Sequence, residues 1–217
     1  MRPIDLPAPK CFEVVGASLS HLTQRLAYRG IKSWRPSPLK PSTRRALECA
    51  QTAIQAATGA RPTEGALWGL LKRDPISRKA RDFIWKALHG AHRVGDYWKN
   101  IPGYETRAVC AHCDVADSLE HILVECAAPG RATAWYLADL LLKNRGFSLR
   151  GPSYGLVLGC QALEILNNKG NLDSGATRLA KIVVSETAYL IWTLRCERVI
   201  GWALEPRRTH SEQEIEN

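Results

Sequence analysis

The sequence has no long apolar run and no secretory signal pattern. Its longest apolar stretches, such as Leu137 to Leu142, are interrupted by charged residues and are far too short to span a bilayer. The opening segment, MRPIDLPAPK, lacks the apolar core of a signal peptide. We therefore expect no contact with a membrane and an intracellular location, in the nucleus or the cytoplasm.

Motifs of several enzyme classes are also missing. The sequence contains no Gly-x4-Gly-Lys-Ser/Thr phosphate loop and no His-Glu-x2-His metalloprotease motif. Its acidic residues show no arrangement typical of the two-metal carboxylate cluster that a ribonuclease H or an endonuclease requires. His89 and His92 lack acidic or thiol neighbours in the sequence, so we interpret them as a helix-end and a loop histidine. We predict that the chain is not an enzyme.

Cysteine is present, but not in the pattern of a secreted protein. The chain has 7 cysteines, an odd number, which argues against a framework of disulfides. Four of them lie singly in apolar or helical surroundings, and we expect buried thiols at Cys11, Cys49, Cys160 and Cys196.

Acidic residues are absent between Glu13 and Glu48, in a chain whose formal net charge is +9. Basic residues accumulate in and at the end of this stretch, at Arg25, Arg29, Lys32, Arg35, Lys40, Arg44 and Arg45. A basic side chain that neutralises a phosphate releases a condensed counterion, so these residues are candidate nucleic-acid contacts. A solvated, flexible basic segment is the alternative, because no base-reading motif accompanies the charge.

Three cysteines and one histidine have the spacing of a metal site, at Cys110, Cys113, His121 and Cys126. A Cys-x2-Cys pair presents two thiolates from a tight turn, and a short helix starting near Ser118 would offer the imidazole. This Cys₃His set suits tetrahedral Zn2+ and leaves no open position for catalysis, so we predict a structural zinc ion. There are two alternatives. His112 could be the fourth ligand in place of His121, or the thiols could be reduced and bind no metal, with a redox pair at Cys110 and Cys113.

Apolar residues recur at helical spacing along most of the chain, and no segment alternates convincingly as a strand. We expect helices at 42–58, from 63 onward, and at 76–89, 131–145 and 174–204. The outer side of the helix at 76–89 is basic, which adds four candidate nucleic-acid contacts: Arg78, Lys79, Arg81 and Lys86.

These patterns predict a mainly α fold, a helical domain with a small zinc-binding insertion and a long C-terminal helix. Residues 1–41 would form an extended basic arm or linker, because prolines interrupt the chain just before the first predicted helix. The helical domain would span residues 42–204 and contain a zinc-binding module at about 76–130. Residues 205–217 would form a polar tail.

Residues 80–126 resemble the reverse transcriptase zinc-binding domain found near the C-terminus of non-LTR retrotransposon polyproteins. The shared pattern is an aromatic-rich helix containing FIWKALHG, then a Cys-x2-Cys pair, SLEH and a final cysteine. Looser likenesses flank this core. AYLIWTLRCERVIGW, at 188–202, resembles the end of fungal members, and LSHLTQRLAYRGIK, at 19–32, resembles the segment that joins their ribonuclease H domain to this region.

The resemblance implies a zinc-stabilised helical module that contacts RNA or DNA and assists an element-encoded reverse transcriptase. It maps the four clustered residues onto the zinc ligands of the family. The sequence departs from a full element protein because it has no Tyr-x-Asp-Asp-like polymerase motif. We therefore expect a detached C-terminal piece, which is a fragment, a decayed copy or a host-retained remnant.

Three functions are compatible with these features. A non-catalytic nucleic-acid-binding module predicts affinity that falls steeply with salt and depends weakly on sequence. A scaffold piece that packs on polymerase or ribonuclease H domains predicts an exposed apolar strip and self-association. A metal-dependent hydrolase needs an open coordination position, which a complete set of four protein ligands does not leave. We favour the first function and keep the second as the alternative.

Overall fold

The computed structural model describes residues 22–34, 38–73, 75–149, 151–202, 208 and 210–216. The chain divides into two units, residues 1–40 and residues 41–217. Two residues with predicted roles, Cys11 and Arg35, lie outside the described residues.

In the first unit, a helix stands where the sequence predicts an extended arm. This helix, α1 (Gln24–Trp34), starts after Thr23, whose Oγ1 accepts a hydrogen bond from the Leu26 N–H at 3.3 Å. The prediction of an extended segment is therefore wrong for residues 24–34. The prolines that suggested it come after this helix, where they do not interfere with its hydrogen bonds.

The second unit is built from helices, which confirms the predicted mainly α fold. Its described elements are α2 (Pro41–Thr58), α3 (Glu64–Leu70), α4 (Arg78–Leu88), α5 (Asp96–Lys99), η3 (Glu105–Ala108), η4 (His121–Glu125), α6 (Arg131–Lys143), α7 (Tyr154–Gly159), η5 (Cys160–Ala162), α8 (Ser174–Cys196), η6 (Glu197–Gly201) and α9 (Glu212–Glu216). The part of the chain that the structure describes has no strand, only isolated bridges at Val109–Ala116 and Leu166–Leu172.

The predicted helix positions agree closely with α2, α4 and α6. Side-chain caps fix two of the starts: Ser77 Oγ accepts the Ala80 N–H at 3.1 Å before α4, and Asp173 Oδ1 accepts the Ala176 N–H at 2.9 Å before α8. The long C-terminal helix ends at Cys196, and the π-helical turn η6 continues it to Gly201. None of the described helices is both long enough and apolar enough to cross a membrane.

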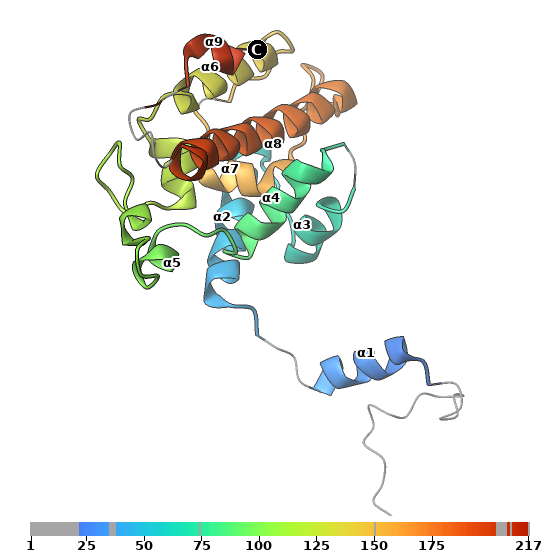
Figure 1. Cartoon of the computed structure of the whole chain (residues 1–217). Coiled ribbons are helices and arrows are strands. Elements are labelled where there is room, and N and C mark those ends of the chain that lie inside the picture. Colours follow the sequence, from blue (N-terminus) through green and yellow to red (C-terminus); the bar gives the residue numbers. More distant parts are fainter. Residues whose placement is uncertain are drawn as a thin grey trace, which may run out of the picture. The chain divides into compact units, whose positions relative to one another are not determined.

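Helix α8 is central to the packing of the second unit. It contacts α4, α6, α7 and the turn η4, and Figure 1 shows it in orange, running across the unit. Its buried side chains include Val184, Ala188 and Ile191, while α2 contributes Leu47 and Ile54 to the core. Each buried Val, Leu or Ile side chain stabilises the fold by about 1.5–3 kcal/mol relative to exposure.

Helices α2 and α7 approach each other through glycines. A Cβ atom at Gly155 would lie 2.4 Å from the Cys49 carbonyl oxygen, and one at Gly159 would lie 2.6 Å from Ile54 Cγ1. Real Cβ atoms do not come this close to their neighbours. The contact between the two helices therefore requires glycine, which has no side chain, at positions 155 and 159.

The predicted polar tail, residues 205–217, contains the short helix α9. Ser211 and Glu214 form a capping box at its start: Ser211 Oγ accepts the Glu214 N–H at 3.2 Å, and Glu214 Oε2 accepts the Ser211 N–H at 2.8 Å. Ile215 is only 7% exposed, and α9 packs on α6. The tail is polar as expected, but its one apolar residue in α9 is buried by a neighbouring helix.

Gly155→Ala tests the contact between α2 and α7. The added Cβ overlaps the α2 backbone, so we expect the free energy of unfolding to fall by about 1–3 kcal/mol. Gly69→Ala in α3 is the matched control, since nothing lies within 4 Å of a Cβ at that position. There we expect no loss, and a gain of up to about 1 kcal/mol. Urea denaturation followed by circular dichroism measures both, and equal effects would contradict the contact.

Candidate metal centre

The first two cysteines of the cluster lie on a tight turn. A bridge joins Val109 to Ala116 and closes the turn at its base. The Asp114 N–H donates to the Cys110 carbonyl at 2.8 Å, and Asp114 itself has a φ of 55°, a left-handed conformation that Asp adopts more readily than most residues. The turn brings the side chains of Cys110 and Cys113 together.

His121 and Cys126 are presented by the widened turn η4. Ser118 begins this turn, as its Oγ accepts the His121 N–H at 3.0 Å, close to where the sequence predicts a helix start. The Cys126 N–H then donates to the His121 carbonyl, five residues back, at 2.7 Å. An α-helical bond reaches only four residues back, so the π-type turn is what allows side chains five residues apart to meet.

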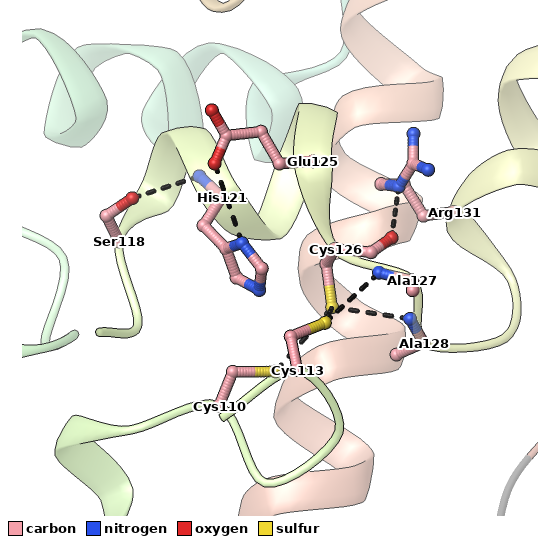
Figure 2. A network of polar contacts seen from close by, with 9 residues as sticks. All are labelled: Cys110, Cys113, Ser118, His121, Glu125, Cys126, Ala127, Ala128 and Arg131. Atoms are coloured by element: carbon pink, nitrogen blue, oxygen red, sulfur yellow. Dashed lines mark hydrogen bonds and ion pairs between the residues drawn. The ribbon is translucent and has the colours of Figure 1, made fainter. Parts of the chain in front are cut away.

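The four predicted ligand side chains converge on one point (Figure 2). The Sγ atom of Cys126 lies 3.7 Å from that of Cys110 and 3.8 Å from that of Cys113. Together with a ring nitrogen of His121, the ligand atoms lie within 4.8 Å of one another. The sulfur separations are far longer than the roughly 2.05 Å of a disulfide bond, and all three cysteines are free. The predicted cluster is confirmed as a set of side chains that can hold one metal ion.

The imidazole of His121 has one nitrogen left for a metal ion. The residue is 5% exposed, and its Nε2 atom is buried without a hydrogen-bond partner. Nδ1 lies 3.6 Å from Glu125 Oε2, which favours a proton on Nδ1 and a lone pair on Nε2. Figure 2 shows the Nε2 edge of the ring turned toward the sulfur atoms. A buried nitrogen without a partner is costly, and a bound cation would remove that cost.

Backbone N–H groups after Cys126 also point at the sulfur atoms. The Ala127 N–H donates to Cys113 Sγ at 3.3 Å, and the Ala128 N–H donates to Cys126 Sγ at 3.4 Å. The first bond lowers the pKa of Cys113, whereas burial raises the pKa of Cys126 to about 12. A cation among the sulfur atoms is the charge that would allow the buried thiol to ionise.

A buried ion pair, which no sequence pattern indicates, connects α8 to the segment that carries the four ligands, residues 110–126, called the metal loop below. Arg195 Nη2 lies 2.5 Å from Asp117 Oδ2, and the two side chains are 4% and 6% exposed. Two further arginines bind carbonyl groups next to the cluster: Arg131 donates to Cys126, and Arg198 donates to Pro129. No local pattern signals the ion pair, because its partners are 78 residues apart.

The predicted nucleic-acid contacts before the second unit include one clear basic face. Arg25, Arg29 and Lys32 are exposed on α1 at positions i, i+4 and i+7, which share one side of a helix. Lys40 is exposed as well. Arg35 lies outside the described residues.

The basic residues predicted in the second unit are less uniform. Arg44 and Arg45 are exposed near the start of α2, and Arg78 and Lys79 are exposed at the start of α4. The other two differ from the prediction, since Lys86 forms an exposed ion pair with Asp82 at 2.7 Å and Arg81 is half-buried and donates to the Ile76 carbonyl. The basic side of α4 is therefore smaller than predicted.

The other histidines and cysteines that the sequence analysis considers do not belong to the metal cluster. His112 is exposed and does not belong to the converging cluster. His89 stacks on Trp68, and His92 hydrogen-bonds the Phe83 carbonyl; among the described residues, neither belongs to a group that could hold a metal ion. Of the three described thiols expected to be buried, Cys160 is buried and Cys196 is half-buried, whereas Cys49 is exposed.

Residues 151–155 read Gly-Pro-Ser-Tyr-Gly, which fits the Gly-x-Ser-x-Gly motif of many hydrolases. In those enzymes the serine sits between a strand and a helix. Here no described strand precedes Ser153, and its Oγ caps α7 by accepting the Leu156 N–H at 3.1 Å. The hydroxyl therefore serves to begin a helix.

Comparison with known proteins adds no relative: no family model, curated protein or solved structure matches the chain. The likeness to reverse transcriptase zinc-binding domains therefore depends on the motifs quoted above.

We expect one metal ion per chain, held by the four clustered side chains. Native mass spectrometry should show its mass in the wild-type protein and its loss in both Cys113→Ser and His121→Ala, because each variant removes one ligand. His112→Ala is the matched control and should retain the ion. A folded wild-type protein without metal, or loss of the ion in His112→Ala, would contradict this assignment.

Asp117→Asn should destabilise the fold strongly, because it leaves the buried charge of Arg195 without a partner. We expect the free energy of unfolding to fall by roughly 3–5 kcal/mol. Asp82→Asn breaks the exposed ion pair with Lys86 and should cost less than about 1 kcal/mol. Urea denaturation of the two variants compares them, and similar small losses would show that the pair of Asp117 and Arg195 is accessible to water.

Proposed function

We propose that the chain is a non-catalytic, zinc-stabilised nucleic-acid-binding module of the type that retrotransposon reverse transcriptases carry. The observation that carries the proposal is the closed cluster of three cysteines and one histidine, in the spacing typical of that family. Exposed basic residues on the elements that precede the cluster support contact with RNA or DNA.

The chemistry of the ligands favours Zn2+. Thiolate sulfur is a poor ligand for Mg2+ and Ca2+, which prefer oxygen, whereas three sulfurs and one imidazole suit zinc. With a Zn–S bond of about 2.3 Å, ligands at the corners of a tetrahedron lie about 3.8 Å apart. The two Sγ separations to Cys126, 3.7 and 3.8 Å, agree with that geometry.

A zinc ion in this cluster would have a structural role. Four protein ligands complete the tetrahedron and leave no position for an activated water. The ion would join the turn at Cys110 and Cys113 to η4, and its binding energy would become folding energy for that turn.

The basic face of α1 supports nucleic acid as the partner. α1 contains no acidic residue, and its three cations lie on one side of the helix. Farther along the chain, Arg44 and Arg45 add two exposed cations near the N-terminus of α2, where unpaired backbone N–H groups also favour anions. Side chains of this kind bind phosphates and do not read bases, so the expected binding has little sequence specificity.

A protein-interaction role is the second candidate, and one observation favours it. α6 exposes a group of large apolar side chains: Tyr136 is 66% exposed, and Leu140 and Leu141 are each 48% exposed. Tyr136 and Leu140 are one helical turn apart, so they share a side of the helix. A polymerase or ribonuclease H domain is the partner that the family resemblance implies for such a face.

Salt dependence of RNA binding tests the proposed function. The triple variant Arg25→Gln, Arg29→Gln, Lys32→Gln removes the basic face of α1. If all three residues contact phosphates of a single strand, the slope of log affinity against log salt should fall in magnitude by about 2. Fluorescence anisotropy with labelled RNA of several unrelated sequences measures the slope.

The control removes the same charge from exposed positions elsewhere, with Lys72→Gln, Arg145→Gln and Arg178→Gln. We expect this variant to keep the wild-type slope. An equal change in both triple variants would mean that only net charge matters. Absence of any salt-dependent binding, together with self-association that Tyr136→Ser abolishes, would favour the scaffold role instead.

A further inference from the structure

A cavity of about 320 Å³ opens directly beside the metal cluster. Its wall includes Cys110 and Cys126 from the cluster, together with residues of α8, η6 and the C-terminal segment. The wall is rich in arginine, with Arg107, Arg195, Arg198 and Arg208. None of the candidate nucleic-acid contacts identified from the sequence lies in it.

The positive charge of this cavity exceeds its negative charge. Of the described residues that line it, only Asp117 carries a carboxylate, which is paired with Arg195, and the thiolates of Cys110 and Cys126 would share the charge of the bound cation. Arg198 is half-buried and donates to the Pro129 carbonyl, a neutral acceptor. A guanidinium that is partly removed from water in this way gains from contact with an anion.

Arg107 connects the cavity to a group of aromatic side chains. Its guanidinium lies 4.6 Å from the ring centre of Tyr104 and 5.3 Å from that of Trp98. Trp98 in turn packs against Tyr97 and Tyr104, with ring centres 5.0 and 5.8 Å apart. Tyr97 and Tyr104 are 45% and 44% exposed, so both have surface available for a planar ligand.

Basic groups beside exposed aromatic rings are the arrangement that binds single-stranded nucleic acid. Guanidinium groups hold phosphates with two parallel hydrogen bonds, and aromatic rings stack on unpaired bases of any sequence. The bases of a duplex are already stacked on each other, so they cannot use the tyrosine rings. The volume of the cavity is near the lower end for ligand pockets, which begins at roughly 300 Å³.

We propose that this cavity binds a phosphate of single-stranded RNA or DNA through Arg107 and Arg198, while neighbouring bases stack on Tyr97 and Tyr104. The inference rests on the proposed nucleic-acid-binding function and assigns it a second contact surface, next to the metal cluster. Arg195 is a positioning residue, since its pairing with Asp117 fixes the wall of the cavity.

Binding of a labelled single strand of about twelve nucleotides tests the proposal, a length within the usual site size of such surfaces. We expect Arg107→Gln to weaken binding about tenfold, and Tyr104→Leu to weaken it by a similar factor. Both variants should bind a duplex of the same length as the wild type does. Arg107→Lys should restore part of the loss, because it keeps the charge but not the paired hydrogen bonds.

Arg178→Gln is the matched control. Like Arg107→Gln, it removes one positive charge, but at an exposed position of α8. With a rise of 1.5 Å per residue, that position lies about 25 Å along the helix from Arg195. Native mass spectrometry and circular dichroism of each variant establish that the metal ion and the fold are retained. A variant that loses either is replaced by Tyr97→Leu, which alters the aromatic group on the other side of Trp98.

The outcomes separate this inference from the proposed function. If the wild type binds single strands and Arg107→Gln, Tyr104→Leu and Arg178→Gln all weaken binding equally, the cavity proposal is overturned and the function stands. If the wild type binds no nucleic acid, both fail. If inorganic phosphate or adenosine monophosphate displaces the strand and binds with the same affinity as the strand, the cavity is a small-anion site. That result would overturn the proposed binding of a strand.

Discussion

Three sulfur atoms and one imidazole nitrogen meet within 4.8 Å, and the turn η4, which carries the imidazole, packs against α6 and α8. The second half of the segment that carries them is held in the core by Leu119, Ile122 and Leu123, whereas the turn with Cys110 and Cys113 contributes no buried apolar side chain, so its attachment depends on what the four atoms bind. The neighbouring helices also contact this segment. Trp135 of α6 donates its indole N–H to the Leu123 carbonyl at 2.7 Å, and Arg195 of α8 pairs with Asp117. Helices α6 and α8 are therefore attached to the metal loop by polar contacts that are buried and directional.

Features whose signal lies within one or two turns of chain could be predicted from the sequence. The Cys-x2-Cys pair, the histidine and the last cysteine are separated by short intervals, so a single turn and a single helical turn suffice to bring them together. The apolar periodicity of α2, α4 and α6 is local in the same sense, and it gave their bounds within about two residues, as expected when helices are packed on one face.

Features that depend on distant partners could not be predicted. Nothing near Asp117 reveals that it will be buried against Arg195, and Ile215 reads as part of a polar tail until α6 is in place to cover it. Counting basic residues also overestimates the positive charge of a helix surface. On α4, such a count ignores Asp82, which pairs with Lys86 one helical turn away. The π-type turn of η4 is a further case: the sequence indicates a helix there, while the position of Cys126 requires a wider turn.

The sequence separations of these contacts also imply an order of events during synthesis. The four ligands fall between residues 110 and 126, so closing their loop costs little chain entropy. Arg195 is synthesised 78 residues after Asp117, so the carboxylate of Asp117 cannot form its ion pair before nearly all of α8 has been made. The metal loop can thus close while its carboxylate is still hydrated, and water leaves that carboxylate only when α8 docks. An α8 docked in another position would leave Asp117 and Arg195 as buried charges without a partner, and that cost disfavours the arrangement.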